Sequence, residues 1–134
     1  MNKLSLFLIV AFCIGLTGCS KDAEVNAFIT EFDATTKEIV SKIDANLSSA
    51  GVDEAQKAFD GKKSSLKTKW DAIKSARGMQ VSADTKKKLE DSVSANMKSL
   101  MEVSTKNAMK LATDKDAATK FQKLMTDYSA TFGQ

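Results

Sequence analysis

Apolar residues recur at intervals of three and four positions from Lys21 onward, a spacing that predicts amphipathic helices. The first stripe is interrupted by one polar residue, Thr36, and its apolar members are Val25, Phe28, Ile29, Phe32, Ile39, Val40, Ile43 and Leu47. Gly51 comes soon after the last of them. Because glycine is common directly after a helix end, we expect the first helix to stop there.

A second stripe consists of Ala55, Phe59, Leu66, Trp70 and Ile73. Asp53 precedes this stripe and is predicted to cap the second helix, and Gly78 is predicted to end it. Gly61 lies inside the same helix, which it weakens by up to about 1 kcal/mol relative to alanine.

A third stripe comprises Leu89, Val93, Met97, Leu100, Met101, Ala108 and Leu111. Ser82 is its predicted N-cap, and Asp114 or Asp116 is predicted to cap a short fourth helix. The apolar residues of that fourth helix are Phe121, Leu124, Met125, Tyr128 and Phe132. Since only residues 113–116 separate the last two stripes, the third and fourth helices could also be continuous.

The faces opposite the stripes are polar, and pairs of acidic and basic residues recur there four positions apart. These pairs are Asp33–Lys37, Glu38–Lys42, Asp53–Lys57, Glu102–Lys106 and Asp116–Lys120. Amphipathic helices with short connections pack antiparallel, so the expected fold is all-α, an up-down bundle of three to four helices in a single domain. The residues expected in its core include Phe32, Ile43, Phe59, Trp70, Leu89 and Leu100.

The first nineteen residues have a different pattern. A short basic start, Met1-Asn2-Lys3, precedes an apolar run over residues 4–14 that is too short to span a bilayer comfortably as a helix. Leu16-Thr17-Gly18-Cys19 follows this run and resembles the lipobox of bacterial lipoproteins. The alternative interpretations of this segment are an ordinary secretory signal and an uncleaved apolar anchor.

The resemblance implies that residues 1–18 are a signal peptide cleaved between Gly18 and Cys19. Cys19 would then carry a diacylglycerol and an amide-linked acyl group, typically palmitate, at the start of a domain covering residues 19–134. Two or more acyl chains anchor a protein stably without a transmembrane helix. Because Ser20, rather than aspartate, follows the cysteine, the resemblance implies the outer membrane, facing the periplasm.

Composition limits the chemistry that the domain can perform. The chain has no histidine and two cysteines; Cys13 would leave with the signal peptide and Cys19 would carry lipid. The mature domain would therefore contain no imidazole base, no disulfide and no free thiol. We expect neither an enzyme nor a cofactor.

Glu24, Glu31 and Glu38 recur every seventh residue on the first helix. Residues seven apart on a helix are separated by about 10 Å, too far to share one substrate atom as an acid–base pair. A solvated face is the simpler interpretation.

Lys62-Lys63 and Lys86-Lys87-Lys88 form the basic clusters, with Arg77 as the only arginine. Nucleic-acid binding would require more arginine and interleaved aromatic residues, so we expect none. The lysines could instead pair with an acidic neighbouring helix or contact anionic lipid headgroups.

Met97 and Met101 lie one turn apart, and Met79, Met109 and Met125 occur elsewhere. Methionine thioethers bind Cu(I), but filling a core is their ordinary use. The sequence thus favours a membrane-anchored, non-enzymatic binding module whose partner is an envelope protein, a peptide or the cell wall. The alternative is a carrier of a small apolar ligand or of Cu(I) between the helices.

Overall fold

The computed structural model describes residues 20–75 and 80–132, and the residues described there form an all-α fold. The helices are α1 (Asp22–Ala45), α2 (Ser49–Ser75), α3 (Ala83–Lys106), α4 (Ala108–Thr113) and α5 (Lys115–Thr131). The predicted fold class is confirmed. Four helices are long, and α4 is a short helix that the sequence pattern did not separate from the third stripe. The predicted signal peptide, Cys19 and the helix end at Gly78 lie outside the described residues.

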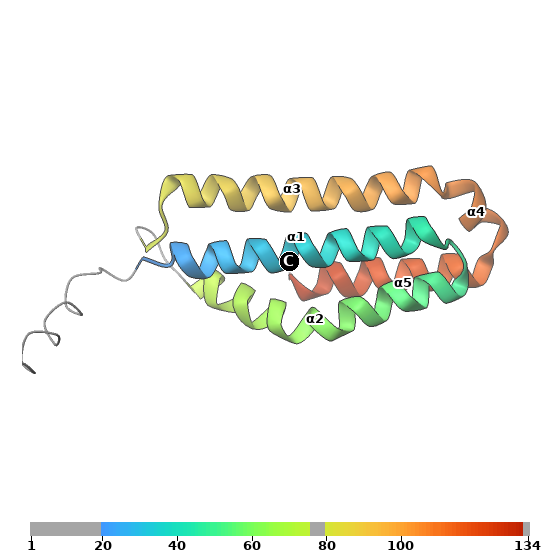
Figure 1. The fold of residues 1–134 in the computed structure, drawn as a ribbon, viewed down its shortest axis with the longest axis horizontal. Helices are drawn as coiled ribbons and strands as arrows, with labels where there is room; N and C mark the ends of the chain where they lie inside the picture. Colours follow the sequence, from blue (N-terminus) through green and yellow to red (C-terminus); the bar gives the residue numbers. More distant parts are fainter. Residues whose placement is uncertain (1–19, 76–79, 133–134) are drawn as a thin grey trace, which may run out of the picture.

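The four long helices lie side by side, and each runs opposite to the long helix before it in the chain (Figure 1). Lys21 donates its backbone N–H to Gln80 across 2.7 Å, and Lys106 pairs with Asp44 at 3.0 Å. Because these contacts join the starts and the ends of α1 and α3, the two helices run parallel. α2 and α5 run in the opposite direction.

In Figure 1, α3 lies on one side of α1, and α2 and α5 lie on the other. α1 packs along both α2 and α3, and α5 packs along α2. Within the described residues, α3 and α5 make no extended contact with each other, so the seam between them is open. Sequence order alone would have placed α3 against α2; the structure places it against α1.

The core is formed by the facing stripes of α1, α2, α3 and α5. Its members are Phe28, Phe32, Ile39, Ile43, Val52, Ala55, Phe59, Leu66, Leu100, Val103, Phe121, Leu124 and Tyr128. Four of the six residues named from the sequence are buried, whereas Trp70 and Leu89 are only partly buried and pack against the edge of this core. Thr36, which interrupts the first stripe, is fully buried as well.

The boundary between α1 and α2 differs from the prediction. α1 ends at Ala45 and α2 begins at Ser49, so Gly51 lies in the first turn of α2 and does not terminate α1. A Cβ atom at Gly51 would lie 1.7 Å from the carbonyl oxygen of Asn46. Glycine is therefore required where the first turn of α2 approaches the backbone of the connection that follows α1. Asp53 is likewise inside α2 and is not its N-cap.

Two other predicted caps are confirmed. Ser82 accepts a hydrogen bond from the backbone N–H of Thr85, and Asp114 accepts one from that of Ala117. The additional break between α3 and α4 occurs at Asn107, whose buried side chain donates to the carbonyl of Val103. Asparagine competes in this way with the backbone bonds of a helix, which explains a break that periodicity did not predict.

Of the five predicted ion pairs, Glu38–Lys42 and Asp116–Lys120 are present, at 3.9 and 3.3 Å. The predicted partners of the other three pairs are wrong. Asp53 pairs with Lys120, Lys57 with Glu54, Glu102 with Lys98 and Lys106 with Asp44. Contacts with neighbouring helices, and other partners three or four positions away in the same helix, displaced the expected pairs.

A candidate binding cleft between α3 and α5

A cleft of about 280 Å³ lies at the open seam between α3 and α5. Val93 and Met97 of α3 line one side and Tyr128, Ser129 and Phe132, at the end of α5, line the other. Phe28 and Phe32 of α1 and Trp70 of α2 also line the cleft. All four long helices thus contribute to it.

The cleft exists because α5 is shorter than the helices around it. At 1.5 Å per residue, its 17 residues span roughly 26 Å, against roughly 36 Å for the 24 residues of α1. The end of α5 therefore lies part-way along the molecule, where the chain terminus is marked in Figure 1. Among the described helices, those that flank the start of α1 past the end of α5 are α2 and α3.

Five aromatic rings gather around the cleft. Phe28 and Phe32 stack at 5.2 Å between centroids, and Trp70 lies 5.3 Å from Phe28. The Phe132 ring meets Phe32 edge-on at 4.8 Å and Tyr128 edge-on at 5.1 Å. Such stacked and edge-to-face pairs are the favoured geometries of aromatic side chains, so the rings fix one another in place.

The hydroxyl group of Tyr128 is satisfied inside the protein. It lies 2.6 Å from Oγ1 of Thr36, which itself donates to the carbonyl of Phe32 at 3.0 Å. Because a threonine hydroxyl has one proton, Tyr128 donates to Thr36. Burial raises the pKa of the Tyr128 hydroxyl despite the opposing effect of the Thr36 hydrogen bond, so this group stays a neutral donor.

The indole N–H of Trp70 is in a different position. Its Nε1 atom is buried and has no hydrogen-bond partner among the described residues. Burying an unpaired donor costs roughly 1–3 kcal/mol, and folded proteins contain few such groups. The partly buried indole ring forms part of the cleft wall.

The predicted lipidation site cannot be placed, because Gly18 and Cys19 precede the described residues. Only Ser20 and Lys21 separate Cys19 from α1. Among the residues described, no helix is long and apolar enough to cross a membrane.

The three glutamates at seven-residue spacing have separate partners. Glu24 pairs with Lys21 at 2.8 Å, Glu38 with Lys42, and Glu31 with Lys69 of α2. The hydrogen bond from Lys69 lowers the pKa of the Glu31 carboxyl, and Ser65 also donates to it. The structure does not bring these carboxylates together.

The basic clusters are dispersed over the surface. Lys63 lies 5.9 Å from the centroid of the Phe59 ring, and Lys87 pairs with Asp91 within α3 at 3.0 Å.

Asp33 accepts hydrogen bonds from Ser92 and Asn96 of α3 at 2.5 and 2.6 Å, so the contact between α1 and the first half of α3 is partly polar.

The methionines do not form a common site in the described part of the chain. Met97 and Met101 line a shallow surface hollow on α3, whose lining includes no third methionine. Met109 is 86% exposed on α4, and Met79 lies outside the described residues. The part of the chain that the structure describes contains no group of three or more acidic, cysteine or histidine residues able to hold a metal ion.

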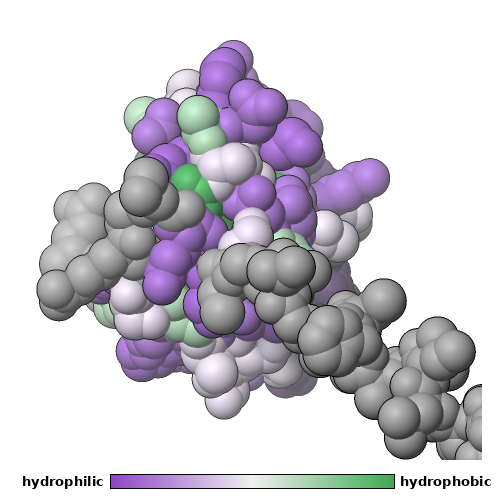
Figure 2. All heavy atoms as spheres, turned by 90° about the vertical axis from the view of Figure 1, so that its left-hand side faces the viewer, coloured by the Kyte–Doolittle hydropathy of each residue, from purple (hydrophilic) through white to green (hydrophobic). Residues whose placement is uncertain are grey.

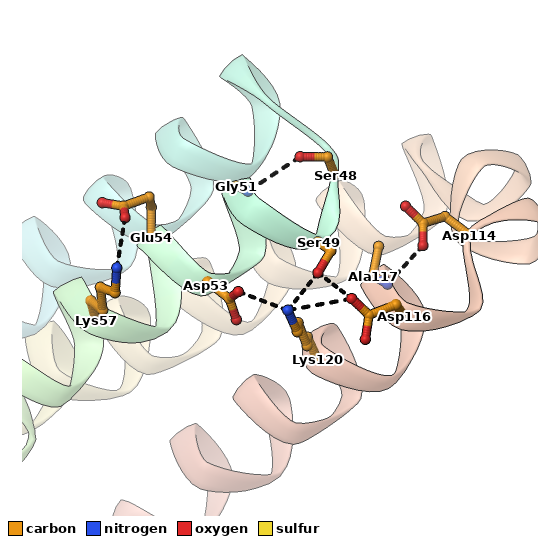
Figure 3. Close-up of polar contacts among 10 residues, drawn as sticks. All are labelled: Ser48, Ser49, Gly51, Asp53, Glu54, Lys57, Asp114, Asp116, Ala117 and Lys120. Atoms are coloured by element: carbon orange, nitrogen blue, oxygen red, sulfur yellow. Dashed lines mark hydrogen bonds and ion pairs between the residues drawn. The ribbon is translucent and has the colours of Figure 1, made fainter.

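A polar network joins the starts of α2 and α5 (Figure 3). Lys120 donates to Asp53 at 2.7 Å and to Ser49, and it also pairs with Asp116. The hydrogen bond from Ser49, followed by that from Lys120, lowers the pKa of Asp116, and Asp53 contributes most to the raised pKa of Lys120. Each group has a partner from the neighbouring helix, so the network serves to hold α2 and α5 together.

Sequence reasoning missed the cleft, although it named most of its residues as core positions. Trp70 is the second-last residue of its stripe and Phe132 the last, and core residues are least covered near the ends of helices. This position in the stripe is the sequence feature that could have indicated the cleft. Comparison with protein-family models, curated proteins and solved structures gives no match to this chain.

Proposed function

We propose that this chain is a lipid-anchored protein of the bacterial envelope whose helical domain is a non-enzymatic binding module. The observation that carries the anchoring is Leu16-Thr17-Gly18-Cys19 at the end of an apolar run of signal-peptide length. Cys19 would carry palmitate-type acyl chains, and two or more such chains suffice for stable attachment. The position of Ser20 favours the outer membrane, facing the periplasm.

Attachment at Cys19 would hold one end of the domain close to the bilayer. α1 and α3 begin at this end, where Ser82 donates its backbone N–H to Asp22 at 2.8 Å. Figure 2 looks onto this end, and most of the described residues visible there are hydrophilic. A hydrophilic end suits a domain that stands on the headgroup surface and does not insert into it.

The cleft between α3 and α5 supports the binding role. Its aromatic walls come from all four long helices, and the described residues that line it include no charged side chain. An envelope protein could insert an apolar side chain there. The same chemistry favours the second candidate function, a carrier of a small apolar ligand, because ligand sites are concave and mostly apolar.

Replacing Cys19 tests the anchoring. We expect Cys19→Ser to leave the unprocessed precursor and to abolish acyl labelling, measured by intact mass and by incorporation of labelled palmitate. Cys13→Ser is the matched control, since it replaces the other thiol within the apolar run and should be processed normally. Normal labelling and cleavage of Cys19→Ser would show that the lipobox interpretation is wrong.

Fractionation of the envelope tests the location. We expect the wild-type protein in the outer membrane fraction; recovery with the inner membrane would refute that assignment without affecting lipidation.

A further inference from the structure

We propose that the cleft between α3 and α5 binds a small, neutral, aromatic molecule about the size of two fused rings. This inference rests on the proposed role of the domain as a binding module and names the class of ligand that the cleft would accept.

The volume of the cleft sets the size of the ligand. An engineered apolar cavity of about 150 Å³ accepts benzene, and ligand pockets for larger molecules begin near 300 Å³. At about 280 Å³, the cleft is close to twice the benzene-binding volume. A molecule of two fused rings fits these limits.

The lining sets the chemistry of the ligand. Five of the eight described lining residues are aromatic, and Val93 and Met97 add apolar surface on the α3 side. Aromatic rings attract further rings in offset or edge-to-face contacts, a gain that a saturated ligand does not provide. Methionine sulfur adds favourable contacts to ring edges.

The polar groups around the cleft favour a neutral ligand. The Tyr128 hydroxyl is already bonded to Thr36, and the Trp70 N–H is already buried, so an apolar ligand displaces no water from either group. Ser129 is exposed and is the one aliphatic hydroxyl residue of the lining. Since the described residues of the lining include no charged side chain, a charged ligand would lose its hydration without gaining an ion pair from them.

The test uses the chain from Ser20 to Gln134, because every helix and every buried residue described lies between Ser20 and Phe132. Trp70 is the only tryptophan, so its indole N–H gives a single resonance on the wall of the cleft. Titration with 2-naphthol should shift this resonance in a saturable manner. Decahydro-2-naphthol has the same skeleton and hydroxyl without aromaticity, and 2-naphthoate adds a charge; both should bind at least tenfold more weakly.

Filling the cleft from its rim locates the site. Ser129→Phe replaces an exposed lining residue and should abolish the saturable shift, whereas Ser64→Phe makes the same change at an exposed position of α2 outside the lining. The proposal is overturned if 2-naphthol causes no saturable shift, if Ser129→Phe binds like the wild type, or if the saturated or charged analogue binds as tightly. Such a failure would leave the test at Cys19 unaffected, so the anchoring is judged independently.

Discussion

At the residue scale, Gly51 and Gly61 lie in the same helix but differ in the space available for a side chain. A Cβ atom at Gly51 would collide with the backbone of Asn46, whereas one at Gly61 would meet no atom within 4 Å. We expect Gly51→Ala to lower the free energy of unfolding by about 3 kcal/mol, since backbone cannot yield as a side chain does. Gly61→Ala should raise it by roughly 0.5–1 kcal/mol.

Urea unfolding of the two variants measures both effects in one background. An unchanged stability of Gly51→Ala would mean that the first turn of α2 does not lie as close to the backbone of Asn46 as the structure indicates.

Thr36 is a polar residue within an apolar stripe, and it provides the hydrogen-bond acceptor for the buried Tyr128 hydroxyl. Thr36→Val leaves the buried hydroxyl of Tyr128 without an acceptor, and we expect a loss of about 1–3 kcal/mol in the free energy of unfolding. The double variant Thr36→Val/Tyr128→Phe removes both partners and should recover part of this loss. Strictly additive effects of the two substitutions in a denaturant-based double-mutant cycle would contradict the coupling.

At the scale of the elements, features fixed within one helix could be predicted from the sequence, whereas features fixed by contacts outside that helix could not. The four long helices and the caps at Ser82 and Asp114 follow from periodicity and from side chains that bond to their own helix start. The prediction for Gly51 was wrong because its role depends on a contact outside its own helix, with the backbone of Asn46. The cleft was missed for the same reason: stripes indicate which face is buried, but they do not determine that α3 packs on α1 and leaves a seam beside α5.

The ion pair between α1 and α2 makes stability depend on pH. The hydrogen bond from Lys69 lowers the pKa of Glu31 from its ordinary value of about 4.5 in the folded chain. This stabilisation is present at neutral pH and is lost as the pH falls below about 4.5 through the lowered pKa. We therefore expect the melting temperature to fall between pH 5 and pH 3, and the fall to be smaller in Glu31→Gln.

Glu102→Gln is the control for this experiment, because Glu102 pairs with Lys98 within α3 and joins no other helix. Its melting temperature should show the same pH dependence as the wild type. If the fall in melting temperature were reduced equally in both variants, the Glu31–Lys69 contact would not account for the pH dependence.

At the scale of the whole molecule, the domain must fold on its core alone, since no cysteine follows Cys19. We expect the chain from Lys21 to Gln134 to be mostly helical by circular dichroism and to unfold in one cooperative transition. Phe32→Ala should cost roughly 3–5 kcal/mol because it removes a large buried side chain. Lys87→Ala, on the exposed face of α3, should change stability by less than about 0.5 kcal/mol.

Equal effects of these two substitutions would mean that the stripes do not share a core. The helices would then be separate amphipathic segments, and the packing of α1 against its neighbours would have to be abandoned.

The early end of α5 also determines where foreign sequence can be attached. Phe132 lies against Phe28 and Phe32 on the wall of the cleft, so a purification tag added after it would leave the molecule beside the cleft opening. Such a tag could obstruct the cleft. α4 lies at the opposite end of the molecule (Figure 1), and Met109 there is almost fully exposed. Reporter groups and affinity handles are therefore better placed at α4 when binding is measured.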